Sequence, residues 1–241
     1  MERFTYFYYH VFWEVVDWIF PPACSGCGKI GERWCSSCDQ KLISLQSQIC
    51  QICGYPVDSG EICEKCSEDR PSFTKLRSIY AYQDELRNAL HRLKYSNDLG
   101  VGEIMGQKCA EFLTLLNWEV DLILPVPLGK KRRRERGYNQ SALIALPLAL
   151  ILKIPFSSNT ILRKKETVTQ IEFKAEERKQ NVKDAFSANP ALVHGKNVLI
   201  IDDVITTGST MDACALELKR AGARNVYGLS VARTMIGKKF T

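Results

Sequence analysis

The sequence predicts an α/β fold, in which a mostly parallel sheet is flanked by helices and preceded by a small cysteine-rich module. Along residues 75–241, short apolar runs alternate with helical patterns, which is typical of strand–helix–strand units. Between residues 23 and 70, eight of the ten cysteines form four CxxC pairs in a stretch with little hydrophobic periodicity. One apolar run, at 198–201, leads directly into two carboxylates and a turn of small residues. Open α/β sheets hold ligands at such strand ends.

The first expected element is an amphipathic helix over residues 1–22. Aromatic and aliphatic side chains recur at helical spacing between positions 4 and 19, and two prolines then end the pattern. The segment is short and carries Glu14 and Asp17, so we expect no transmembrane segment. Its apolar face either packs on the protein's own core or lies at a membrane surface.

The cysteine module over residues 23–70 predicts two structural Zn²⁺ sites. Repeated CxxC pairs are the donor pattern of tetrahedral Cys₄ zinc centres. A disulfide framework would need an oxidising compartment, and no secretion signal is evident, so zinc is favoured. Sequential pairing of the first four and the next four cysteines is the simplest arrangement, and interleaved pairing stays open. The expected ligands are Cys24, Cys27, Cys35, Cys38, Cys50, Cys53, Cys63 and Cys66.

The expected elements of the larger domain follow in chain order. Strands are expected at 76–82, 122–127, within 155–162, at 198–202 and at 226–232, and helices at 86–95, from 101 to about 117, at 139–152 and at 211–221. Residues 1–72 carry six basic against ten acidic side chains, whereas the remainder carries 27 basic against 17 acidic ones. This basic excess suits a phosphate-rich ligand, either nucleotide-like or a nucleic acid.

The segment 198–210 carries the most specific chemistry. Its apolar strand ends in Asp202 and Asp203, which suit a polyol or a metal-bound polyol. A helix is expected to begin after the following turn, and free N–H groups at a helix N-terminus bind anions. The turn therefore predicts a phosphate site made by Thr206, Thr207, Gly208, Ser209 and Thr210.

A second constellation follows the expected strand at 122–127. Residues 130–136 hold six Lys or Arg side chains in seven positions, at the same edge of the sheet as the carboxylates. Guanidinium groups match phosphate oxygens in a bidentate manner, so this loop suits a pyrophosphate, and a nucleic acid is an equally credible ligand.

Two sets of motifs resemble known families. The order of residues in 198–210 resembles the phosphoribosyl-pyrophosphate (PRPP) signature of type I phosphoribosyltransferases. The motifs PVPL, RGYNQ, LHRLKY, TxTQ and VART, together with the CxxC pairs, resemble the ComF family of double-zinc-ribbon, phosphoribosyltransferase-like competence proteins. The resemblance covers almost the whole chain and implies a type I phosphoribosyltransferase-like fold at 75–241.

The resemblance also implies residue roles. The acidic pair would hold the ribose hydroxyls, with Mg²⁺ carried by PRPP, and the turn would hold the 5′-phosphate. Lys94 matches a basic position that follows the first strand. The pyrophosphate-side loop would comprise Lys130, Arg132, Arg136, Asn139 and Gln140, and a flexible loop would comprise Thr167, Gln170, Arg178 and Asn181.

The expected function is binding of PRPP or a related sugar phosphate by a cytoplasmic protein of natural transformation. Its expected partners are incoming single-stranded DNA and DNA-uptake or helicase proteins. Whether the site also catalyses phosphoribosyl transfer is open, because nothing in the sequence identifies an acceptor. The alternatives are a non-catalytic adaptor for single-stranded DNA with a regulatory PRPP site, and a purine-salvage phosphoribosyltransferase.

Overall fold

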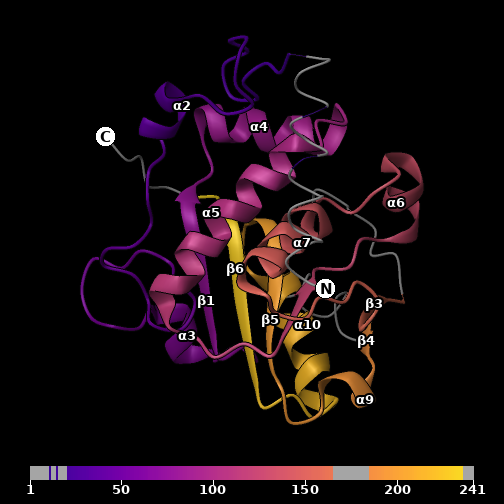
Figure 1. The fold of residues 1–241 in the computed structure, drawn as a ribbon. Coiled ribbons are helices and arrows are strands. Elements are labelled where there is room, and N and C mark those ends of the chain that lie inside the picture. Colours follow the sequence, from indigo (N-terminus) through magenta and orange to yellow (C-terminus); the bar gives the residue numbers. More distant parts are fainter. Residues whose placement is uncertain (1–10, 12–14, 16–20, 165–184, 236–241) are drawn as a thin grey trace.

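A computed structural model describes residues 11, 15, 21–164 and 185–235 of the chain (Figure 1). The amphipathic helix expected at 1–22 therefore lies almost entirely outside the described residues. None of the helices in the described part is long and apolar enough to cross a membrane.

The centre of the molecule is a four-stranded, fully parallel sheet in the order β1-β6-β5-β2. This confirms the predicted parallel sheet. All four strands are rich in buried aliphatic side chains, as expected for strands covered on both faces. Their bounds are β1 Lys75–Ala81, β2 Leu122–Pro125, β5 Asn197–Ile205 and β6 Asn225–Arg233.

Helices cover both faces of the sheet (Figure 1). One face packs on α4 (Asp84–Tyr95), α5 (Gly100–Leu116) and α7 (Gln140–Leu152). The opposite face packs on α10 (Ser209–Arg220). Beside α10 lie a small antiparallel pair, β3 (Ile161–Arg163) with β4 (Phe186–Ala188), and the short helix α9 (Pro190–Val193). Alternate residues of the sheet thus enter two separate apolar cores.

The cysteine module lies along the free edge of β1. Its residues 43–45 and 52 bond to this strand, because Leu45 N–H donates to the Ile79 carbonyl at 2.9 Å and Leu76 N–H donates to the Ile52 carbonyl at 2.8 Å. An uncovered edge strand would expose unpaired backbone groups, and the module satisfies them. Its two short helices are α2 (Ser36–Gln40) and α3 (Glu64–Glu68).

Two expectations about local structure were wrong. The strand expected at 198–202 continues to Ile205, because Val204 and Ile205 still pair with β6, so the two carboxylates lie inside β5. The basic run expected as a loop forms helix α6 (Lys130–Arg136). Lys and Arg favour helices, and Gly137 ends this one with a left-handed φ of 79° and an N–H bond to the Arg133 carbonyl.

Candidate functional site

The two adjacent carboxylates have different surroundings. Asp203 is 3% exposed and forms an ion pair with Lys94 at the end of α4. Asp202 is only partly buried and accepts a hydrogen bond from the hydroxyl of Ser141, in the first turn of α7, at 3.0 Å. Its Oδ1 also accepts the backbone N–H of Asp203 at 3.0 Å. Asp203 is therefore neutralised by a neighbouring helix, whereas Asp202 is the more accessible carboxylate.

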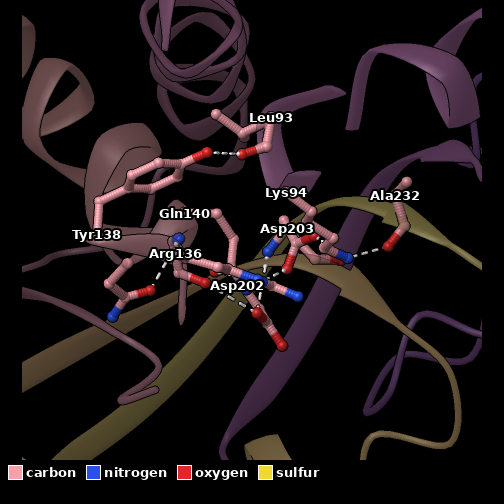
Figure 2. Close-up of polar contacts among 11 residues, drawn as sticks. Leu93, Lys94, Arg136, Tyr138, Gln140, Asp202, Asp203 and Ala232 are labelled. Carbon is pink, nitrogen blue, oxygen red and sulfur yellow. Dashed lines mark hydrogen bonds and ion pairs between the residues drawn. The ribbon is translucent and has the colours of Figure 1, made fainter. Parts of the chain in front are cut away.

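A chain of polar contacts extends from Asp203 into the RGYNQ motif (Figure 2). The Gln140 amide donates to Asp203 Oδ1 at 3.4 Å and accepts a hydrogen bond from Arg136 at 2.9 Å. The Arg136 guanidinium also lies over the Tyr95 ring, 4.9 Å from its centroid. Tyr138 donates its hydroxyl proton to the Leu93 carbonyl at 2.6 Å, which ties the motif to α4. These contacts fix Arg136 beside the acidic pair.

The electrostatics of the pair follow from burial and proximity. Although part of the Asp202 side chain is exposed, its carboxyl group is largely surrounded by protein, and this desolvation and next the charge of Asp203 raise the pKa of Asp202 to about 8. Burial alone would lower the pKa of Lys94, but the charges of Asp203 and Asp202 raise it above its ordinary value. A cation that binds to the Asp202 carboxylate would therefore compete with a proton.

The turn after β5 has a conformation that exposes backbone donors. Gly208 adopts a left-handed φ of 82° and precedes the first residue of α10. The hydroxyls of Thr207 and Ser209 lie 2.8 Å apart and bond to each other. No side chain caps the helix at Gly208, and the Ser209 N–H makes only a 3.4 Å contact with the Thr207 hydroxyl, so the first turn of α10 presents N–H groups that an anion can accept.

The structure separates the residues predicted for the pyrophosphate side. Arg136 and Gln140 lie in the network around Asp203. Asn139 instead caps α7, because its side chain accepts the Ser141 N–H at 3.1 Å and donates to the Val126 carbonyl at 2.9 Å. Lys130 and Arg132 are exposed on α6. The predicted flexible-loop residues Thr167, Gln170, Arg178 and Asn181 lie outside the described residues.

Three contributors to the site are less apparent from sequence. Ser141 directly follows the RGYNQ motif, so a polar residue at the start of α7 was a usable signal. The family resemblance identified Lys94 only as a basic position, and the structure shows that its ion-pair partner is Asp203. The ammonium group of Lys65, in the cysteine module, donates a hydrogen bond to the Thr207 carbonyl at 3.1 Å. These two residues are 142 positions apart in the sequence, so no local pattern could predict their contact.

The cysteines gather in two groups of four, Cys24, Cys27, Cys35 and Cys38, and Cys50, Cys53, Cys63 and Cys66, and each group's ligand atoms lie within 4.8 Å of one another. This confirms sequential pairing. The Sγ atoms of Cys24 and Cys38 are 3.6 Å apart, as are those of Cys53 and Cys63. Sulfurs in a tetrahedral zinc site with bonds of about 2.3 Å lie about 3.8 Å apart, whereas a disulfide needs about 2.05 Å. The geometry fits zinc.

The surroundings of two cysteines favour the thiolate that zinc requires. Burial raises the pKa of Cys24, but hydrogen bonds from the backbone of Cys27, Cys35 and Gly26 outweigh it and lower that pKa to about 6. Cys50 has the same type of backbone donors, and its pKa falls to about 7. A dication among the four sulfurs would favour deprotonation of the remaining thiols.

Comparisons with known proteins agree with this architecture. Residues 15–67 match the double zinc ribbon domain family, and residues 139–239 match the phosphoribosyl transferase domain family. The chain is 32% identical to DNA utilization protein YhgH of Salmonella typhi over 207 residues, covering 83% of this chain and 90% of that protein. It is 32% identical to competence protein F of Haemophilus influenzae over 215 residues, covering 83% of this chain and 90% of that protein.

A more distant relative is competence protein ComFC of Bacillus subtilis, at 29% identity over 83% of this chain and 85% of that protein. Among solved structures, the glutamine PRPP amidotransferase of B. subtilis aligns with a TM-score of 0.40 and 24% identity, over 55% of this chain and 26% of that chain. The family assignment rests on the two domain matches and the sequence relatives. The chain belongs to the ComF family, in which a double zinc ribbon is joined to a phosphoribosyltransferase domain.

Proposed function

We propose that this protein binds PRPP or a related sugar phosphate, with Mg²⁺, at the C-terminal end of β5. The observation that carries this proposal is the position of Asp202 and Asp203 in the C-terminal half of β5, the strand that leads into the Gly208 turn and α10. The 5′-phosphate would accept hydrogen bonds from the hydroxyls of the turn and the first N–H groups of α10. The ribose hydroxyls would donate to Asp202.

The charged network beside β5 suits the pyrophosphate. Arg136 donates a hydrogen bond to Gln140, and Gln140 donates one to Asp203. A guanidinium held in this way can bind phosphate oxygens without first losing much conformational freedom. Oxygen donors suit Mg²⁺, and Asp202 is the more accessible carboxylate, so the donor set fits a Mg²⁺ ion that arrives with the pyrophosphate.

Any transfer reaction at this site would depend mainly on positioning and electrostatics. Departure of pyrophosphate leaves positive charge on the ribose, which nearby carboxylates stabilise. Bound Mg²⁺ would neutralise charge on the leaving group. This chain's residues would orient the ribose through Asp202 and hold the leaving group near Arg136. The acceptor is not part of the proposal.

The proposed biological role is the handling of incoming single-stranded DNA in the cytoplasm during natural transformation, together with DNA-uptake or helicase proteins. The names of the relatives, a competence protein and a DNA utilization protein, support this role. Helix α6 offers a basic surface: six of its seven side chains are Lys or Arg, and none of the seven is buried. It therefore also supports the second candidate, a DNA-binding adaptor with a regulatory sugar-phosphate site.

One experiment separates these functions. Binding of PRPP with Mg²⁺, and of a single-stranded oligonucleotide, is measured by calorimetry for the native protein and for two variants. Asp202→Asn should weaken PRPP binding and leave DNA binding intact. The double charge reversal Lys131→Glu/Arg134→Glu on α6 should weaken DNA binding and leave PRPP binding intact. Glu119→Gln, an exposed acidic residue just before β2 at the opposite edge of the sheet, is the matched control.

The binding measurement on the native protein tests the main proposal. Failure to bind PRPP with Mg²⁺ at millimolar concentration would overturn it. If PRPP binds, production of pyrophosphate in the presence of candidate bases or amines then distinguishes an enzyme from a sensor. If the α6 variant binds DNA as well as the native protein does, the DNA surface proposed here is wrong.

A further inference from the structure

The first zinc ribbon is the segment that holds Cys24, Cys27, Cys35 and Cys38, and the second is the segment that holds Cys50, Cys53, Cys63 and Cys66. The second ribbon contacts the turn assigned to the sugar phosphate. Lys65 lies in α3, between the zinc ligands Cys63 and Cys66. Its Nζ atom donates to the Thr207 carbonyl at 3.1 Å, so the lysine head lies at the start of the 206–210 turn. An ammonium carries three N–H groups, and one of them makes this contact. Two further N–H groups are left on an ammonium that already lies at the turn.

The ribbon is held against the sheet by two arginines, of which Arg233 is buried and Arg77 is partly buried. Arg233, at the end of β6, is 3% exposed and donates to the Cys53 carbonyl at 2.7 Å. Arg77, in β1, donates to the Gln51 carbonyl at 3.0 Å. The carbonyls that accept these bonds belong to the Cys50–Cys53 pair, whose conformation a bound zinc ion would fix.

The ribbon also shares packing with α10. Ile52 of the ribbon belongs to the same apolar core as Met211 of α10, together with Phe73 and Leu76 from the segment that follows the ribbon. After the ribbon, the Ser72 N–H donates to Asp212 Oδ1 in the first turn of α10 at 2.6 Å. The second ribbon and the N-terminus of α10 are therefore packed together, and a shift of one would displace the other.

We propose that the second ribbon forms one wall of the sugar-phosphate site, with Lys65 as a direct ligand of the 5′-phosphate and zinc as the group that fixes the position of Lys65. This inference rests on the proposed function, because it assigns the phosphate to the 206–210 turn. Zinc binding at Cys50, Cys53, Cys63 and Cys66 and sugar-phosphate binding are then thermodynamically linked, and each strengthens the other.

The first ribbon has a different environment and serves as an internal comparison. It contacts α4, the turn after it and α5: the Ser25 hydroxyl donates to Asp98 at 2.7 Å, Asn88 donates to the Gly26 carbonyl at 3.3 Å, and Asp39 forms an ion pair with Lys108. Its Trp34 packs in the core on the α4 and α5 side of the sheet. Zinc in this ribbon should be insensitive to the ligand.

The first test measures the affinity of three probes: ribose 5-phosphate, PRPP with Mg²⁺, and inorganic pyrophosphate. Lys65→Met should weaken ribose 5-phosphate and PRPP by about tenfold, which is typical for loss of one charge-assisted hydrogen bond. Pyrophosphate, which lacks the 5′-phosphate, should change by less than about twofold. Lys65→Arg should restore part of the affinity, since the cation remains. Lys29→Met, an exposed lysine of the first ribbon, removes the same charge as a control.

The second test measures zinc release to a chromogenic chelator. Saturating ribose 5-phosphate should slow the release of about one of the two zinc ions. The protection should be several-fold weaker in Lys65→Met and unchanged in Lys29→Met. Protection of both ions, or of neither, would overturn the proposed linkage.

The outcomes separate this inference from the proposed function. If the native protein binds neither sugar phosphate, the proposed function and this inference both fail. If it binds them and Lys65→Met equals Lys29→Met in affinity and zinc release, only the role of Lys65 and the second ribbon fails. Unfolding midpoints of the variants identify any that have lost the fold.

Discussion

Lys94 of α4 forms an ion pair with Asp203 of β5 inside the molecule (Figure 2). The Lys94 side chain is 19% exposed and that of Asp203 is 4% exposed, so neither charge is well hydrated. Breaking a buried pair leaves an uncompensated charge and costs about 3–5 kcal/mol. We expect Lys94→Met to lower the free energy of unfolding by roughly this amount in urea titrations.

An exposed pair supplies the control for this prediction. Lys41 and Glu85 lie 2.6 Å apart, but the Lys41 side chain is 59% exposed. Exposed pairs contribute about 0–1 kcal/mol, so Lys41→Met should change stability little. Adding Asp203→Asn to Lys94→Met should recover part of the loss. Equal losses in the two lysine variants would show that burial of the Lys94 pair is unimportant.

Asp202 should make stability depend on pH. Its pKa is about 8 in the folded protein, against an ordinary value of 3.8, because of burial and the neighbouring Asp203 charge. The folded state thus keeps a proton that the unfolded state releases, so this contribution is complete below about pH 4 and is lost as pH rises towards 8. Urea unfolding at about pH 5 and about pH 8 should show this decrease, and Asp202→Asn, which cannot ionise, should show a smaller one. Identical decreases would contradict the prediction.

Metal analysis should find about two zinc ions per chain. Cys27→Ser and Cys63→Ser each remove one ligand from a different group, so each variant should retain about one tightly bound ion. Cys27 is exposed and Cys63 is partly buried, which limits the damage to packing. Cys109→Ala, which changes a fully buried thiol of the core in α5, should retain both ions. Loss of both ions in either single-site variant would indicate one shared centre.

Much of this fold follows from local patterns. The sheet was predictable because strands such as Val198–Ile201 are continuous apolar runs that only a covered sheet can bury. The zinc ligands were predictable because CxxC spacing places both thiolates on one ion. The acidic pair was recognisable because carboxylates are unfavourable at the end of a buried strand unless a ligand or a partner uses them.

The rest depends on contacts between distant parts of the chain. Strand β4 has only three residues and exists because it pairs with β3, so its own sequence gives little signal. Asn139, predicted near the pyrophosphate, also caps α7, and its sequence position did not reveal this second role because Asn suits both. The contact between Lys65 and Thr207 depends on how the ribbon docks beside α10, and nothing in either local sequence specifies that docking.

The close approach of α5 and α7 should make Gly102 intolerant of larger side chains. A Cβ at this position would lie 2.8 Å from Leu143 Cβ and 2.9 Å from the Leu143 carbonyl oxygen, and backbone atoms cannot move aside cheaply. Gly102→Val should therefore reduce the free energy of unfolding by about 1–3 kcal/mol, as overpacking does. Thr114→Val, in the last turn of the same helix, is the control because its side chain is exposed. Similar losses at both positions would exclude overpacking as the cause.

The substitution Gly208→Ala changes the backbone conformation of the 206–210 turn without adding a steric clash. Its φ of 82° strains any residue with a Cβ, but the nearest atom to an added Cβ would be Leu76 Cδ2 at 3.7 Å, which is ordinary contact. Gly208→Ala should thus lower stability by about 1 kcal/mol through backbone strain alone. Gly195, in the turn before β5, has a φ of 72° and nothing within 4 Å, so Gly195→Ala carries the same strain at the opposite edge of the sheet. Both variants should lose similar stability in urea titrations, but only Gly208→Ala should weaken ribose 5-phosphate, by about tenfold, because relaxation of the strain redirects the N–H groups of the turn. Equal ribose 5-phosphate affinities in the two variants would mean that the phosphate binds elsewhere.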